Sequence, residues 1–168
     1  MPMLLLALAA TTMSGCAPEP QPSPTPTPAF ASEEEAFAAA EEVYRAYNEA
    51  GNARIAGEST PDPQDYLIGE ALEADMEGLR FLSEQGLRLT GEGVLAAFSG
   101  IDVMDAEGSV TITALVCLDG TAIHVLDAGG IDATPEGREE IVAQVVTFIG
   151  SQAEMQIAKE SAAAAEQC

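Results

Sequence analysis

Hydrophobic side chains recur at helical spacing between residues 32 and 51. Ser32, with Glu35 three positions later, forms the S-x-x-E pattern of a capping box, and the acidic residues there suit the positive end of a helix dipole. Gly51 is the kind of residue that ends a helix. The pattern therefore predicts a first helix over residues 32–51, with an apolar face formed by Phe37, Ala40, Val43, Tyr44 and Tyr47.

A second helical pattern covers residues 64–85, after a turn at residues 57–63. We expect this helix to be broken near Gly69. Arg80, Glu84 and Arg88 follow one another at four-residue spacing, which favours ion pairs on a solvated helix face over a functional site. The apolar positions on the opposite face are Leu67, Leu72, Met76, Leu79 and Leu82.

Later in the chain the hydrophobic period changes to two, which indicates β-strands. The clearest alternation, residues 110–118, leads into Asp119-Gly120 and a second run at residues 121–127. Asp-Gly between alternating runs predicts a hairpin with a two-residue loop. In that register His124 lies opposite Leu115, on the face away from the predicted core.

Weaker alternation predicts further strands at residues 87–104, 141–149 and 154–159. Helices come first in this chain and the strands follow. That order predicts an α+β domain, with the helices packed on an antiparallel sheet.

The first residues have a different pattern. An apolar run over residues 4–13 stops at Ser14 and Gly15, directly before Cys16, which is the layout of a signal peptide with a processing site. The cysteine at that place resembles the bacterial lipobox. We therefore expect residues 1–15 to be a lipoprotein signal peptide and Cys16 to be the acylated anchor in the bilayer. The alternative is an uncleaved first helix of the folded domain.

Residues 16–31 are predicted to be a linker that carries the lipid on Cys16. Six prolines occupy every second position from Pro18 to Pro28, which is typical of a linker. Alternating prolines hold the backbone near polyproline II and remove donors that a helix or sheet needs. Such a linker extends about 3.1 Å per residue. Residues 32–168 then form one domain, large enough for a single core.

The chain has 28 acidic and 6 basic residues and a net charge of −22. The electric field of such a negative protein repels phosphate backbones, which excludes nucleic acid as a partner. The field also repels anionic lipid head groups, so electrostatic attraction would not hold the domain at a membrane and a covalent anchor is needed for that. We expect the protein on the extracytoplasmic face of the cell membrane.

Tyr44 and Tyr47 in the first predicted helix, Cys117-Leu118-Asp119 at the end of a predicted strand, and Cys168 form a pattern of their own. Together with the lipobox and the order of the elements, the pattern resembles small actinobacterial lipoproteins with a nuclear transport factor 2-like (cystatin-like, SnoaL-like) domain. The resemblance covers residues 32–168. It implies N-terminal helices packed on a curved antiparallel sheet.

With Cys16 acylated, Cys117 and Cys168 remain as an even pair in an exported, disulfide-permissive compartment. The resemblance and this count favour a disulfide between them over two free thiols. We expect no metal site and no cofactor, because two cysteines and the distant His124 do not make a ligand set.

Folds of this class include isomerases and cyclases that use Asp, His or Tyr inside an apolar cavity. A simpler reading is preferred for these candidates: His124 as a surface residue, Asp102 and Asp127 beside strand ends, and Tyr44 and Tyr47 as core residues with wet hydroxyls. We therefore assign no catalytic residue. The tyrosines considered are Tyr44, Tyr47 and Tyr66.

The sequence thus favours a non-catalytic domain that binds a small apolar ligand or a neighbouring envelope protein. The alternative is a cavity enzyme of the ketosteroid isomerase or SnoaL-like type. A further possibility is an accessory domain that only assembles other proteins.

Overall fold

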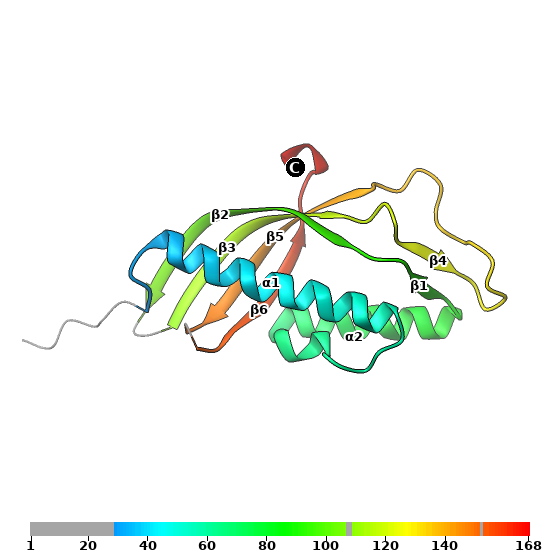
Figure 1. Cartoon of the computed structure of the whole chain (residues 1–168), viewed down its shortest axis with the longest axis horizontal. Coiled ribbons are helices and arrows are strands. Elements are labelled where there is room, and N and C mark those ends of the chain that lie inside the picture. The colour runs from blue at the N-terminus through cyan, green and yellow to red at the C-terminus, as the bar shows by residue number, and fades with distance from the viewer. Residues whose placement is uncertain (1–28, 107–108, 152) are drawn as a thin grey trace, which may run out of the picture.

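The computed structural model describes residues 29–106, 109–151 and 153–168 (Figure 1). The predicted signal peptide, Cys16 and most of the predicted linker lie outside these residues. Along the chain the described elements are α1 (Glu33–Ile55), η1 (Pro63–Tyr66), α2 (Gly69–Gln85), β1 (Arg88–Thr90), β2 (Val94–Ala106), β3 (Ser109–Asp119), β4 (His124–Leu126), β5 (Ile141–Gly150), β6 (Met155–Ala162) and η2 (Ala165–Gln167).

The long strands form one antiparallel sheet in the order β2-β3-β5-β6, and β1 and β4 form a separate two-stranded ribbon. Figure 1 shows α1 lying across the long strands, with α2 and the β1–β4 ribbon at the same end of the molecule. The predicted α+β class is confirmed.

Helix α1 begins as the sequence predicts. The Ser32 side-chain oxygen accepts a hydrogen bond from the Glu35 N–H at 3.3 Å, and the Glu35 carboxylate accepts one from the Ala31 N–H at 2.9 Å. The predicted end is wrong, because the helix runs through Gly51 to Ile55. One glycine costs only about 1 kcal/mol inside a helix, which flanking turns readily offset.

The core lies between α1 and the inner face of the sheet. Ala36, Ala40 and Tyr44 are fully buried at four-residue spacing, and the two alanines let the helix axis approach the strands closely. Phe148 on β5 packs edge-on against Tyr44, with ring centroids 6.4 Å apart, and against Phe98 at 6.1 Å.

Phe30 also belongs to this core, although the sequence analysis placed it in the linker. The packed domain therefore begins before residue 32. The Ala29 N–H donates to the Asp105 carboxylate at 2.9 Å, which holds this lead-in segment against β2.

Three bulges interrupt the pairing of the sheet. On β2, Ala96 and Ile101 are extra residues relative to β3. On β6, Ala158 is extra relative to β5, so that Ile157 faces Phe148 while Glu160, three positions later, faces Val146. Phe148 and Val146 both lie on the inner face, so the bulge brings Glu160 to the same side as Ile157.

The predicted hairpin at Asp119-Gly120 is wrong. Asp119 does make a turn, since its carboxylate accepts from the Thr121 N–H at 2.9 Å, but β3 then pairs with β2 and β5, and both of its edges are occupied. The chain instead leaves the sheet, pairs β4 with β1 (His124 opposite Thr90), and returns at Ile141.

The disulfide between Cys117 and Cys168 is present, as predicted, with a Cα–Cα distance of 5.8 Å. Cys117 points to the outer face of the sheet, away from α1. There the bond holds the η2 segment close to β5, where the Ala163 N–H donates to the Ala143 carbonyl oxygen at 2.9 Å.

The second helical pattern is confirmed as η1 followed by α2, which starts at Gly69. Helix α2 packs beside β6, and Ala71 is its one buried residue. No helix within the described part of the chain has the length and apolar character needed to cross a membrane.

Candidate ligand-binding site

A half-buried carboxylate, Glu160, lies between β6 and α1 beside two tyrosines. The Tyr47 hydroxyl donates to Glu160 Oε2 at 3.4 Å. The Tyr44 hydroxyl lies 3.4 Å from Glu160 Oε1 and 3.1 Å from Gln144 Oε1, and it donates to one or the other. Across residues 29–106, 109–151 and 153–168, no Lys, Arg or His forms an ion pair with Glu160.

The electrostatics of this cluster follow from burial. Burial raises the pKa of Glu160 above its usual value, and the hydrogen bonds from Tyr44 and Tyr47 offset this in part. Burial and the Glu160 charge also raise the pKa of both tyrosines well above 10. The hydroxyls therefore stay protonated donors, and the ionised carboxylate is costly to the folded domain.

Glu160 lines a pocket of about 210 Å³, which we call the Glu160 pocket. Polar groups of α1 border it, since Asn48 and Asn52 both donate to the Gly93 carbonyl oxygen at 2.9 Å. The rest of the wall is mainly apolar and includes Ile55, Leu118, Ile123 and Val142.

An ion pair closes one side of the Glu160 pocket. Arg54 donates to both carboxylate oxygens of Asp75, and Gln64 donates to the same carboxylate at 3.0 Å. Burial alone would raise the pKa of Asp75, but these hydrogen bonds lower it below its usual value. The pair is therefore charged at neutral pH and joins α1 to α2.

On the other side of this ion pair is a second hollow of about 590 Å³, which we call the α1–α2–β1 groove. It shares Gly51, Arg54 and Ile55 with the Glu160 pocket. The remaining lining is mostly small or apolar and comes from the turn after α1, from α2 and from β1: Ala56, Gly57, Asp75, Gly78, Leu79, Leu82, Arg88 and Leu89.

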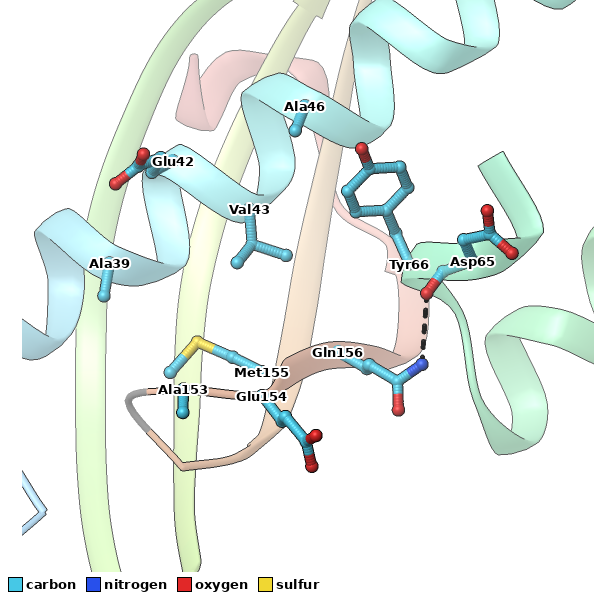
Figure 2. A pocket seen from close by; sticks show the side chains of 10 residues that line it. All are labelled: Ala39, Glu42, Val43, Ala46, Asp65, Tyr66, Ala153, Glu154, Met155 and Gln156. Atoms are coloured by element: carbon cyan, nitrogen blue, oxygen red, sulfur yellow. Dashed lines mark hydrogen bonds between the residues drawn. The ribbon is translucent and has the colours of Figure 1, made fainter. Parts of the chain in front are cut away.

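A third hollow, about 710 Å³, lies between α1, η1 and the turn before β6. Figure 2 shows Tyr66 of η1 on one side of it, Met155 on another, and the hydrogen bond of 3.2 Å from Gln156 to the Asp65 carbonyl oxygen. Its carboxylates, on Glu42, Asp65 and Glu154, belong to exposed residues. No buried polar group points to a ligand here.

The structure separates the residues that the sequence analysis considered for catalysis. Tyr44 and Tyr47 meet at Glu160, whereas Tyr66 lies in the hollow of Figure 2. Asp102 is exposed on the outer face of the sheet, opposite Thr113.

His124 and Asp127 also lie apart from the Glu160 cluster. His124 is a surface residue, as predicted, although for a different reason: it lies on the β1–β4 ribbon, and its Nδ1 is 3.0 Å from Asp132. Asp127 accepts hydrogen bonds from Gly129 and Ile131 within a turn.

Sequence reasoning missed Glu160, Gln144 and the Arg54–Asp75 pair. Gln144 has a signal, because it alternates with Val146 and Phe148 on the inner face of β5. Glu160 has no such signal in the sequence, because the bulge at Ala158 moves the Glu160 side chain from the outer to the inner face of the sheet. In the described segments, no group of three or more His, Cys, Asp or Glu side chains is arranged to hold a metal ion.

No protein-family model matches the chain, and no curated protein matches it. Among solved structures, the chain is similar to the crystal structure of the intermembrane space region of the chloroplast protein ARC6. The two share 14% sequence identity with a TM-score of 0.50, and the match covers 76% of this chain and 96% of that one. At this identity the likeness shows the fold alone, and it agrees with the α+β class.

Proposed function

We propose that this protein is an extracytoplasmic lipoprotein, anchored through Cys16, whose α+β domain binds a small ligand in the Glu160 pocket. The observation that carries the binding proposal is the Glu160 carboxylate, which is partly buried and has no basic partner in the described part of the chain. A charge that is partly removed from water and has no opposite charge beside it costs stability. Its presence beside a pocket is best explained by a ligand that pairs with it.

The pocket lining indicates the chemistry of the ligand. Leu118, Ile123 and Val142 suit an apolar body, and Glu160 suits a hydrogen-bond donor on that body. An engineered cavity of about 150 Å³ binds benzene, so a pocket of about 210 Å³ has room for one ring with a small substituent. This agrees with the small, largely apolar ligand that the sequence favours.

Binding is tested with benzyl alcohol and benzylamine as donor-bearing probes and toluene as the matched probe without a donor. We expect amide NMR shifts around the Glu160 pocket, and roughly tenfold weaker binding of the two donor probes to Glu160→Gln (about 1.4 kcal/mol). Toluene binding should stay the same. Glu154→Gln, an exposed carboxylate outside the pocket, is the control. If no probe binds, or if Glu160→Gln leaves all three unchanged, the proposal fails.

The anchor and the nuclear transport factor 2-like assignment belong to the same proposal. Three features of the sequence support the anchor: the lipobox, the proline-rich linker, and the net charge of −22, which opposes electrostatic binding to anionic lipids. A helix lying across an antiparallel sheet supports the assignment. Mass spectrometry of the membrane fraction should find an acylated Cys16 as the first residue. An intact Met1 or an unmodified Cys16 would contradict the anchor.

The cavity enzyme is the second candidate function, and one observation favours it: a carboxyl group with a raised pKa lies within hydrogen-bond reach of Tyr47. Such a pair can move a proton next to a carbonyl. The test is exchange of the α-protons of cyclohexanone in D₂O. Exchange that is faster than buffer and lost in Glu160→Gln would make the domain an enzyme, while exchange at the buffer rate rejects this candidate.

A further inference from the structure

The α1–α2–β1 groove has the features of a binding site of its own. Its volume of about 590 Å³ lies within the usual range for small-molecule sites, and such sites are mostly apolar with a few placed polar groups. Ile55, Leu79, Leu82 and Leu89 supply the apolar lining, and three different elements contribute to it.

The charges around the groove are distinctive for this acidic chain. Of the 6 basic residues, Arg45, Arg54, Arg80 and Lys159 form ion pairs with carboxylates. Arg138 donates to backbone carbonyl oxygens, including that of Ile123 at 2.7 Å. Arg88 alone has neither kind of partner within the described residues, and it lines the groove.

The sequence pattern predicted Arg88 to continue a helical ion-pair ladder with Glu84. The structure contradicts this, because α2 ends at Gln85 and Gly86 turns the chain in a left-handed conformation with φ 64°. Arg88 therefore begins β1, opposite Leu126, and leaves Arg80 to pair with Glu84. The turn thus places Arg88, an exposed arginine, in the lining of the groove.

We propose that this groove binds an amphiphile with an anionic head group, such as a long-chain carboxylate or an alkyl phosphate. The alkyl chain lies against Leu79, Leu82 and Leu89, and the head group pairs with Arg88. A guanidinium offers two parallel donors that match carboxylate and phosphate oxygens. Arg54 contributes no charge to the ligand, because Asp75 already neutralises it.

Four probes with the same ten-carbon chain test the head group: decanoate, decyl phosphate, decanol and decyltrimethylammonium, each titrated calorimetrically below its micelle concentration. We expect one or both anions to bind at least tenfold more tightly than decanol, and the cation to bind most weakly. The stronger anion identifies whether the source is a fatty acid or a phosphate-bearing lipid. Equal binding of all four, or preference for the cation, would overturn the proposal.

Two variants locate the site. Arg88→Gln should remove the preference for anions and leave decanol binding unchanged, whereas Arg80→Gln, on the exposed face of α2, should leave both unchanged. Gly78→Leu should block all four probes, because a side chain at Gly78 meets nothing within 4 Å and extends into the groove. Melting curves confirm that each variant is folded.

The Glu160 pocket is tested separately. Glu160→Gln should not change decanoate binding, since Glu160 does not line the groove. If Glu160→Gln and Arg88→Gln weaken decanoate equally, the anion does not sit at Arg88, and the proposal of a second site is rejected whatever becomes of the first.

Discussion

Two halves of this domain differ in how fully the apolar side chains between helix and sheet are buried. In the closed half, where α1 lies over the long strands, Tyr44, Phe148 and Ile112 are fully buried. In the open half, formed by the end of α1, α2 and the β1–β4 ribbon, Met76 and Phe81 remain 55% and 57% exposed. Both proposed sites lie in the open half or at its border, where the Arg54–Asp75 pair joins the helices.

The difference indicates a division of roles within one small domain. Burial of apolar surface is the main source of folding free energy, so the closed half carries most of the stability. Segments with few buried contacts open more easily and are the usual places for ligand binding. The open half can therefore vary in packing without unfolding the domain.

The largest expected contrast comes from truncating one aromatic residue in each half. Phe148→Ala should destabilise the domain by about 3–5 kcal/mol, because it leaves a cavity beside Tyr44 and Phe98. Phe81→Ala should cost less than about 1 kcal/mol, since the ring is mostly in solvent. Urea denaturation measures both. Similar losses for the two variants would mean that the halves do not differ in this way.

The disulfide should contribute somewhat less than the core ring. It closes a loop with a sequence separation of 51, worth about 4 kcal/mol at most in the chain-entropy model. Cys168→Ser should lower the melting temperature by several degrees, and reduction of the natural chain should have the same effect. Thiol titration checks the bond directly. Two free thiols in the oxidised domain would show that it is absent.

Glu160 lies at the border of the halves and should respond to pH. Its pKa is raised in the folded state, so the folded state holds the proton more tightly than the unfolded chain does. Stability should therefore fall as the pH rises from 4.5 through the folded pKa. Glu160→Gln should remove this loss and stabilise the domain by on the order of 1 kcal/mol at pH 7.5. Melting temperatures of the natural chain and of Glu160→Gln are measured from pH 4 to 8. If the two change with pH in the same way, Glu160 is not the source of the pH dependence.

A comparison of two glycines, one in each half, includes the smallest effect expected of any variant, that of Gly78→Ala. Gly78→Ala in α2 should stabilise the domain by about 0.5–1 kcal/mol, because alanine favours a helix and its Cβ has open space. Gly100→Ala on β2 should instead destabilise by about 1–3 kcal/mol, since the new Cβ would lie 2.4 Å from the Phe37 ring. Chemical denaturation should give changes of opposite sign in the free energy of unfolding for the two variants. An increase for Gly100→Ala would contradict the close packing of α1 on β2.

Most elements of the fold could be predicted from local patterns. The Ser32 cap, the break near Gly69 and the alternation of β3 and β5 are encoded in a few neighbouring residues each. The hairpin failed because Asp119-Gly120 specifies a turn and not its destination. Which strands pair with β3 depends on long-range contacts such as Phe98 with Phe148, and these are invisible to a local pattern.

The candidate site was predicted only in part, for a related reason. Tyr44 and Tyr47 follow the helical period and were assigned to the core, not to a binding site. Glu160 was missed, because strict alternation places it on the face opposite Ile157, and only the extra residue Ala158 reverses that. Arg88 was grouped with Arg80 and Glu84 by its four-residue spacing, although the predicted helix ended at residue 85; the structure places Arg88 in β1, beyond the turn at Gly86.

The bulges on β2 have a consequence for association between copies of the chain. β2 is an edge strand of 13 residues, and a straight edge of that length invites pairing with another strand. Ala96 and Ile101 each break the hydrogen-bonding rhythm along it, so a second β2 cannot align over more than a few residues. This irregular edge therefore keeps neighbouring copies of the domain from joining into a continuous sheet.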